Sequence, residues 1–405
     1  MATFFLIIIY LAFISLGLPD SLLGTAWPVM RQELEAPLSA AGLVFMTIAA
    51  GTIVSSLLSG RVLNRYGTGK VTLISCIMTA GALLGYAFAP SLAWLFVFAV
   101  PLGLGAGAVD SGLNNYVAAH YKAHHMSWLH SFWGVGATLG PIIMAQFITG
   151  RSDWRDGYLT VAVIQFALVV ILLFTLPLWD RVARTGGVNG SDKAEEEVTV
   201  SHASDARPTK PLRIKGVKLA MLSFLFYCSV EATVGLWGSS FLVGVKELSA
   251  AQAAQWVSFY YLGITVGRFV TGFITFKVSN RRLIRSGQLT AMAGALLLLL
   301  PLPSVFALIG LIVIGLGLAP IFPCMLHETP VRFGKRHSQT IMGYQMAMAY
   351  TGSTFLPPFF GFLASAVSIG AFPWFIAVSA AAMLLCSEQL NGRLGARESK
   401  PNSQF

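Results

Sequence analysis

The chain has 405 residues, of which 55% are hydrophobic and only 11% are charged, and its formal net charge is +10. Soluble domains carry about 25% charged residues, so this composition excludes a protein that folds mainly in contact with water. Apolar segments long enough to span a bilayer, about 20 residues each, follow one another along almost the whole chain.

The hydropathy pattern predicts twelve membrane-spanning helices. In chain order they lie at residues 4–28, 38–60, 70–90, 92–119, 126–149, 157–179, 216–244, 251–276, 283–301, 303–326, 338–366 and 371–388. The first begins close to Met1, follows no basic segment and contains Pro19-Asp20 near its end, which favours a retained span over a cleaved signal peptide. The expected fold class is an all-α polytopic membrane protein.

The second half of the sequence repeats landmarks of the first about 212 positions later. The glycine-rich segment 103–105 recurs at 315–317, and Gly140 recurs as Gly352. A repeat of this length in an apolar chain predicts two pseudo-symmetric bundles of six helices.

The only long polar stretch divides these two halves. We assign the N-terminal bundle to residues 1–180, a cytoplasmic linker to 181–215 and the C-terminal bundle, with a short cytoplasmic tail, to 216–405. The linker contains paired glycines and an acidic run, a composition that predicts disorder.

Basic residues are distributed unevenly between the loops. With both termini in the cytoplasm, twenty-two Lys and Arg residues fall on cytoplasmic segments and four on the other side. This positive-inside bias predicts a multi-pass protein of the cell (inner) membrane with cytoplasmic termini. The net charge then follows from topology and from anionic lipid, so we expect lipids as partners, no nucleic acid, and a monomer.

No pattern in the sequence indicates an enzyme, a cofactor or a metal site. The four cysteines lie in apolar segments without C-x-x-C spacing, so we expect buried thiols. The glycines at 103–107 follow no strand, which argues against dinucleotide binding. His120, His124 and His125 have no Cys or carboxylate nearby, which argues against zinc.

The segment from Gly60 to Lys70 resembles the signature loop of the major facilitator superfamily, between its second and third helices. Gly60, Asn64, Arg65 and Gly67 match its glycine, Asp or Asn, basic and second glycine positions, with Asn64 where Asp is commoner. The helix count, the central loop and the repeat fit as well. The resemblance implies the major facilitator fold, alternating access between two bundles, and a gating role for these four residues.

Within that superfamily, three segments are similar to the fucose-permease-like sugar:proton symporters. They are residues 18–24, 105–116 and 128–137. In that group, acids in helices 1 and 4 are linked to sugar binding and proton coupling. The resemblance therefore implies these roles for Asp20 and Asp110, the latter standing where a longer Glu is usual.

Four charged residues fall well inside predicted spans: Asp20, Asp110, Glu231 and Arg268. A charged side chain at the centre of a span costs about 2.5–3.5 kcal/mol, so these side chains should face protein or a water-filled cavity. A carboxyl group withdrawn from water can bind and release a proton near neutral pH. We therefore predict proton coupling by the three acids, and a snorkelling or interhelix ion-pair role for Arg268.

Polar and aromatic residues near these acids form the predicted substrate site. An aromatic ring beside a carboxylate that accepts hydrogen bonds from hydroxyls is common in sugar sites, and Trp27 follows Asp20 by two helical turns. A structural hydrogen bond is the alternative role, for Asp110 with His130 or a helix backbone as the partner. The predicted set is Asp20, Trp27, Asn114, His130, Trp133, Glu231, Trp237 and Gln345.

The leading hypothesis is a proton-coupled symporter of a monosaccharide or a similar small polyhydroxylated solute. The main alternative is proton-driven efflux of an apolar or cationic compound, which thirteen Met and twenty-eight Phe residues would suit. Sodium is an alternative coupling ion, because carboxylate, amide and hydroxyl oxygens also bind it. A receptor on the same fold would bind its ligand without flux, and fold alone does not decide among these functions.

Overall fold

The computed structural model describes residues 2–121, 123–149, 153–190, 211–275 and 277–398, which are almost entirely helical. The first half of the chain forms α1 (Ala2–Asp20), α2 (Leu22–Glu33), α3 (Ala40–Tyr66), α4 (Thr68–Ala87), α5 (Leu92–His120), α6 (Ala123–Phe147) and α7 (Trp154–Gly190). The second half forms η1 (Pro211–Arg213), α8 (Val217–Lys246), α9 (Ala250–Ile274), α10 (Asn280–Leu299), α11 (Ser304–Leu318), α12 (Ile321–Phe333), α13 (Lys335–Ala366), η2 (Ile369–Ala371) and α14 (Phe372–Glu398).

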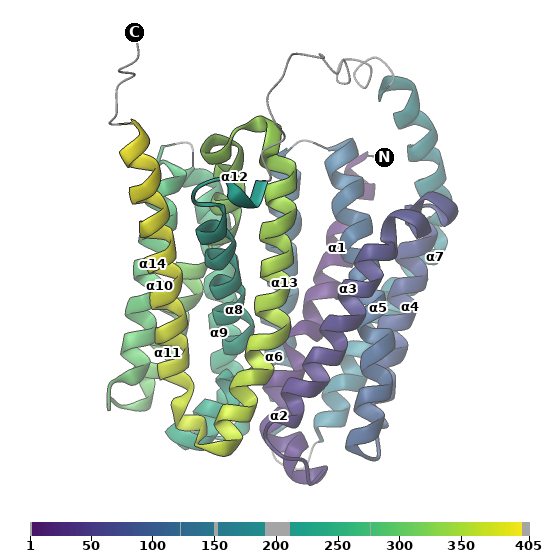
Figure 1. Cartoon of the computed structure of the whole chain (residues 1–405). Coiled ribbons are helices and arrows are strands. Elements are labelled where there is room, and N and C mark those ends of the chain that lie inside the picture. Colours follow the sequence, from purple (N-terminus) through teal and green to yellow (C-terminus); the bar gives the residue numbers. More distant parts are fainter. Residues whose placement is uncertain (1, 122, 150–152, 191–210, 276, 399–405) are drawn as a thin grey trace.

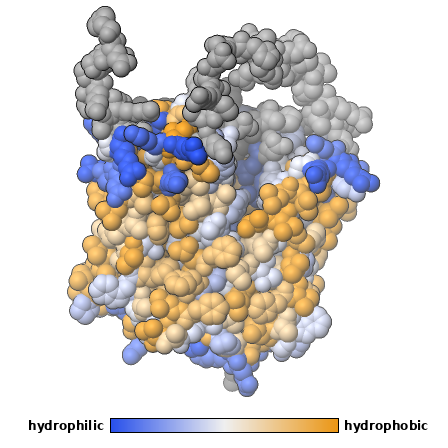
Figure 2. Space-filling view, in the orientation of Figure 1, coloured by the Kyte–Doolittle hydropathy of each residue, from blue (hydrophilic) through white to orange (hydrophobic). Residues whose placement is uncertain are grey.

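The helices stand side by side, and the start of α1 and the end of α14 lie at the same end of the bundle (Figure 1). Within the described residues, nine helical segments are long and apolar enough to cross a membrane, three of which join consecutive elements, α1 with α2, α11 with α12 and η2 with α14. The helices α6, α10 and α13, of 25, 20 and 32 residues, complete the twelve predicted spans. Figure 2 shows the resulting apolar belt, with polar residues gathered at its two ends.

The two halves repeat the same packing. In the first half α3 and α4 pack against α5, α4 against α7, and α1 against α6. In the second half the equivalent pairs form, because α9 and α10 pack against α11, α10 against α14, and α8 against α13. The predicted two-bundle architecture is confirmed by this internal repeat of helix pairs.

The first span is broken between α1 and α2, directly after Asp20. Pro19 has no N–H and therefore cannot bond to the carbonyl of Ser15 one turn earlier. The buried amide of Gln165 on α7 donates to that carbonyl instead, at 2.6 Å. The break is thus stabilised by a replacement hydrogen bond, which keeps the backbone acceptor satisfied.

We call the end of the bundle where α1 begins and α14 ends the basic end, and the other one the opposite end. At the opposite end the two halves are in direct contact. Ser39 N donates to Ser365 Oγ at 3.1 Å, joining α3 to α13, and Ser239 donates to the carbonyl of Thr25 at 3.3 Å, joining α8 to α2. A Cβ on Gly24 would strike the backbone of Gly235 and Leu236, so α2 and α8 cross there at backbone contact.

The helix α7 is longer than the sequence predicted. The sixth span was expected to end at residue 179, but helix continues to Gly190 and so includes the first ten positions of the expected linker. Residues 191–210, for which disorder was predicted, lie outside the described residues. The linker and the domain limits therefore stay predictions.

Candidate functional site

Asp20 is exposed although it lies in the interior of the first span, at the break between α1 and α2. Its Oδ2 accepts a hydrogen bond of 2.7 Å from the indole Nε1 of Trp133 on α6. Beyond Asp20 toward the opposite end, α2 packs directly against α8 at Gly24. The α2–α8 contact at Gly24 therefore lies between Asp20 and the opposite end.

Trp133 connects Asp20 to the charged pair of the second half. The guanidinium of Arg268 on α9 lies 5.4 Å from the centroid of the Trp133 ring, and Arg268 Nη2 donates to Glu231 Oε1 on α8 at 3.0 Å. The ring of Tyr261 meets Trp133 edge to face, with 6.4 Å between centroids. Charged and aromatic groups from both halves thus converge on one place.

Asp110 and Asn114 form a second polar group on α5. Asn114 Nδ2 donates to Asp110 Oδ1 at 2.9 Å, one helical turn apart. Asp110 interacts electrostatically with Asp20 and, across the divide between the halves, with Tyr350 on α13. The structure therefore brings the predicted acids together, because Asp20 also interacts with Glu231.

His130 is exposed and lies one helical turn from Trp133 on α6, with its ring edge to face against Phe13 at 5.9 Å. It interacts electrostatically with Arg268. The expected structural bond between Asp110 and His130 is not among the hydrogen bonds of the described residues, where Asp110 is bonded to Asn114 instead.

Trp27 and Trp237 lie apart from this group. Both are fully buried, with the indole N–H of Trp27 donating to Leu38 O at 3.0 Å and that of Trp237 to Pro357 O at 2.8 Å. The sequence placed Asp20 and Trp27 on one helical face, but Asp20 is exposed whereas Trp27 is fully buried, so the two side chains do not share a site in this conformation. In this conformation the two indoles pack the sealed opposite end.

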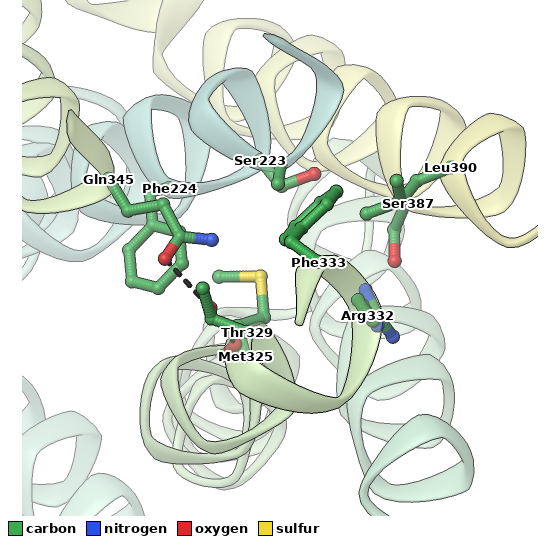
Figure 3. A pocket seen from close by; sticks show the side chains of 10 residues that line it. Ser223, Phe224, Met325, Thr329, Arg332, Phe333, Gln345, Ser387 and Leu390 are labelled. Atoms are coloured by element: carbon green, nitrogen blue, oxygen red, sulfur yellow. Dashed lines mark hydrogen bonds between the residues drawn. The ribbon is translucent and has the colours of Figure 1, made fainter. Parts of the chain in front are cut away.

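Gln345 occupies a separate small pocket within the second half, between α8, α12, α13 and α14 (Figure 3). It is 2% exposed, and its Oε1 accepts a bond of 2.8 Å from the hydroxyl of Thr329. Phe224, Met325 and Phe333 form the apolar part of the lining. The sequence predicted Gln345 as a substrate ligand, and the structure places it in this pocket, where its partner is Thr329.

The predicted gating residues lie at the α3–α4 turn of the basic end. Gly67 is both the C-cap of α3 and the N-cap of α4. Its φ angle of +79° is a backbone conformation that favours glycine. Gly60, Asn64 and Arg65 are exposed, and the guanidinium of Arg65 lies 5.4 Å from the ring centroid of its neighbour Tyr66.

Two residues of this central group, Arg268 and Tyr261, were not predicted from the sequence to form the substrate site. Arg268 was expected to snorkel or to form an ion pair, and the structure shows the ion pair with Glu231. Tyr261 was one of several span hydroxyls without a distinguishing signal. We call Asp20, Trp133, Arg268, Glu231 and Tyr261 the central cluster. Within the described residues, no group of three or more metal-ligating side chains is present.

The family model of the Major Facilitator Superfamily matches residues 9–348. The chain is similar to the Saccharomyces cerevisiae protein named "Bypass of stop codon protein 6", with 23% identity over 89% of this chain and 77% of that protein. It is also similar to the glucose/mannose transporter GlcP of Bacillus subtilis, with 23% identity over 78% of this chain and 77% of the transporter.

Solved structures share the arrangement of helices. The inward-open form of the xylose transporter XylE of E. coli superposes with a TM-score of 0.75 at 12% identity, covering 96% of each chain. At this identity the likeness concerns the fold.

Proposed function

The chain belongs to the major facilitator superfamily and is a membrane transporter, and from this we propose that it carries a monosaccharide or a similar small polyhydroxylated solute together with protons. Transport would proceed by alternating access, with the bundles at residues 1–180 and 216–405 rocking about the central cluster. The similarity to a glucose/mannose transporter supports a sugar as the solute.

The observation that carries this proposal is the exposed Asp20 carboxylate bonded to the Trp133 indole between the two halves. A carboxylate accepts hydrogen bonds from sugar hydroxyls, and an aromatic face covers the apolar C–H surface of a pyranose. Asn114 and His130 would supply further neutral hydrogen-bonding groups. Trp27, Trp237 and Gln345 would then contribute to packing in this conformation.

The proton would be carried by a carboxylate of the first half. Glu231 has a cationic partner, Arg268, at 3.0 Å. Asp20 and Asp110 are bonded to neutral donors, Trp133 and Asn114, and neither forms an ion pair among the described residues. A proton can neutralise an acid that has no fixed countercharge, so we rank Asp20 and Asp110 above Glu231 as carriers.

The positive-inside bias supports cytoplasmic termini. With that orientation the structure would be the inward-facing state, in which the site would exchange with the cytoplasm while the halves are in contact at the opposite end. The exposed turn with Gly60, Asn64, Arg65 and Gly67 would then be free to bind a neighbouring helix when the basic end closes. Sodium replaces the proton in the variant of this proposal that carboxylate and amide oxygens also allow.

A second candidate function is proton-driven efflux of a cationic compound. It is favoured by the excess of acids over bases in the centre, because Asp20, Asp110 and Glu231 face a single Arg268. Such an exporter would bind lipophilic cations more tightly than sugars.

The test is uptake of radiolabelled D-glucose, D-mannose and D-xylose into proteoliposomes with a proton gradient directed inward. We expect accumulation above the external concentration, lost in Asp20→Asn or Asp110→Asn while sugar exchange is retained. Glu231→Gln should reduce both rates together. Asp156→Asn, an exposed acid at the start of α7, is the matched control and should behave as the native chain.

Two outcomes would reject the proposal. Sugar uptake that stays the same when a proton gradient or a sodium gradient is imposed would exclude coupling to either ion. An absence of flux for all three sugars, together with extrusion of a lipophilic cation such as tetraphenylphosphonium, would favour the efflux function.

A further inference from the structure

We propose that Trp133 is the positioning residue through which protonation of Asp20 changes the contact between the two halves of the transporter. The inference rests on the proton coupling proposed above and adds to it a specific route. The route is Asp20, the indole N–H and ring of Trp133, the guanidinium of Arg268, and the carboxylate of Glu231. Its members come from α1 and α6 in one half and α9 and α8 in the other.

The backbone of Trp133 is fixed at the junction of these helices. On one side, a Cβ on Gly17 would strike the Trp133 carbonyl, so α1 and α6 are in backbone contact. On the other side, a Cβ on Gly134 would strike the hydroxyl of Thr265, so α6 packs tightly against this side chain of α9. Since neither neighbour leaves room for the backbone to move, the side chain is the part of Trp133 that can respond.

The indole responds differently to the two protonation states of Asp20. Its N–H is a donor only, and a bond to a charged acceptor is about twice as strong as one between neutral groups. Protonation of Asp20 therefore weakens the 2.7 Å bond, and the new carboxyl O–H finds no acceptor on the indole. The side chain is held by the charged form and released by the neutral one.

A movement of the Trp133 indole affects the second half because the guanidinium of Arg268 lies over the indole ring. Attraction between a guanidinium and an aromatic face depends on the position of the cation over the ring. Arg268 is held on its other side by Glu231 at 3.0 Å, and both are surrounded by the phenols of Tyr227 and Tyr260. A tilt of the indole therefore alters a contact that joins the halves.

Other ionisable groups also face Asp20. Asp110 approaches from α5, Glu231 from α8 and Tyr261 from α9, and each interacts with it electrostatically. Trp133 is distinguished from them by a direct hydrogen bond to the Asp20 carboxylate. The three others interact with Asp20 electrostatically, without a hydrogen bond to its carboxylate among those that the described residues form.

The experiment measures how accessible the contact between the two halves is at the opposite end, and it requires no substrate. A cysteine replaces Ser39, which lies at the sealed opposite end where α3 meets α13, in a background with Cys386→Ala. Labelling of Ser39→Cys by a membrane-impermeant maleimide is followed as a function of pH in nanodiscs. The variants are Trp133→Phe, which keeps a ring beneath Arg268 and loses the N–H, and Asp20→Asn, which cannot change its charge.

We expect labelling in the native background to depend on pH, and this dependence to be lost in Trp133→Phe and in Asp20→Asn. The double variant should equal Asp20→Asn alone, because both changes interrupt the same route. Trp374→Phe is the matched control, since this indole is 65% exposed on α14, and it should keep the native pH dependence.

The alternatives are distinguishable. If Trp133→Phe keeps the native pH dependence while Asp20→Asn loses it, protonation acts by another route and the inference is overturned, with proton coupling intact. If the native background itself shows no pH dependence, proton coupling and this inference both fail. If Trp133→Phe does not fold, the inference is decided by Trp133→Tyr, which keeps a ring and an O–H donor, does not titrate near neutral pH and should keep the pH dependence; its loss in this variant would overturn the inference.

Discussion

The helices α3 and α9 occupy equivalent places in the two halves, but they are buried to very different extents. Buried residues extend along α9 from Ala251 to Thr271. On α3 they are confined to the first turns, Ala40 to Val44, with Ser59 as the single exception. Two interfaces that the repeat makes equivalent, α6 with α9 and α3 with α13, are therefore closed to different degrees.

This difference indicates how the molecule opens. The α6–α9 interface remains packed beyond the middle of the bundle, where Gly134 meets Thr265. The α3–α13 interface is held at the opposite end, where Ser39 meets Ser365 and Gly42 meets Pro358. The halves thus hinge along one interface and part along the other, and the central cluster lies on the hinge side.

The largest expected effect comes from preventing closure at α3 and α13. A Cβ at Gly42 would lie 2.7 Å from the Cα of Pro358, a distance that backbone atoms cannot accept. Gly42→Ala should therefore hold the opposite end apart and reduce sugar uptake about tenfold, equivalent to about 1.4 kcal/mol. Transport by Gly81→Ala, where a Cβ meets nothing within 4 Å, is the control. Equal uptake in the two variants would contradict the closure described here.

The next effect tests the hinge side. Glu231 and Arg268 have side chains 21% and 15% exposed, so removal of one leaves the other poorly compensated. Glu231→Gln or Arg268→Gln alone should lower the free energy of unfolding by about 3 kcal/mol, and the double variant by less than either. Thermal unfolding in detergent gives the comparison. Additive losses would mean that the pair is not coupled.

A smaller effect is expected from the two sealing indoles. Trp27→Phe and Trp237→Phe each remove one indole N–H that donates to a backbone carbonyl. Each should lower the free energy of unfolding by about 1 kcal/mol and leave the affinity for sugar unchanged. Sugar binding measured by calorimetry checks this. A large loss of affinity in either variant would show that the substituted tryptophan takes part in substrate binding.

The smallest effect is expected at Gln345. Gln345→Leu removes the acceptor of the Thr329 hydroxyl, which keeps its second bond, to Met325 O at 3.2 Å. Stability should fall by about 1 kcal/mol or less, with the transport rate and the affinity unaltered. A marked change in affinity at constant stability would show that the pocket in Figure 3 communicates with the central cluster.

The fold could be predicted from the sequence because a bilayer imposes one rule, about 20 apolar residues per span. That rule located all twelve spans and their repeat. It could not locate the break after Asp20, because a proline in a span kinks or interrupts the helix depending on what replaces the lost hydrogen bond, here Gln165 from a distant helix.

The candidate site was predictable in its charges and not in its contacts. Asp20, Asp110 and Glu231 stood out because charge inside a span is costly. The bond from Trp133 to Asp20 joins residues 113 positions apart, and the place of Gln345 depends on how α12 and α13 pack. Spacing along one helix contains neither kind of information, which is why Trp27 was assigned beside Asp20.

The crossing of Gly24 and Gly235 has a consequence for the energy supply of the cell. Protons move through proteins along files of hydrogen-bonded water, and at this crossing the two backbones touch. The site is thereby isolated from one compartment while it is in contact with the other. A carrier built this way can draw on the membrane potential in single turnovers without short-circuiting it, and the absence of a side chain at Gly24 is what lets the two backbones meet.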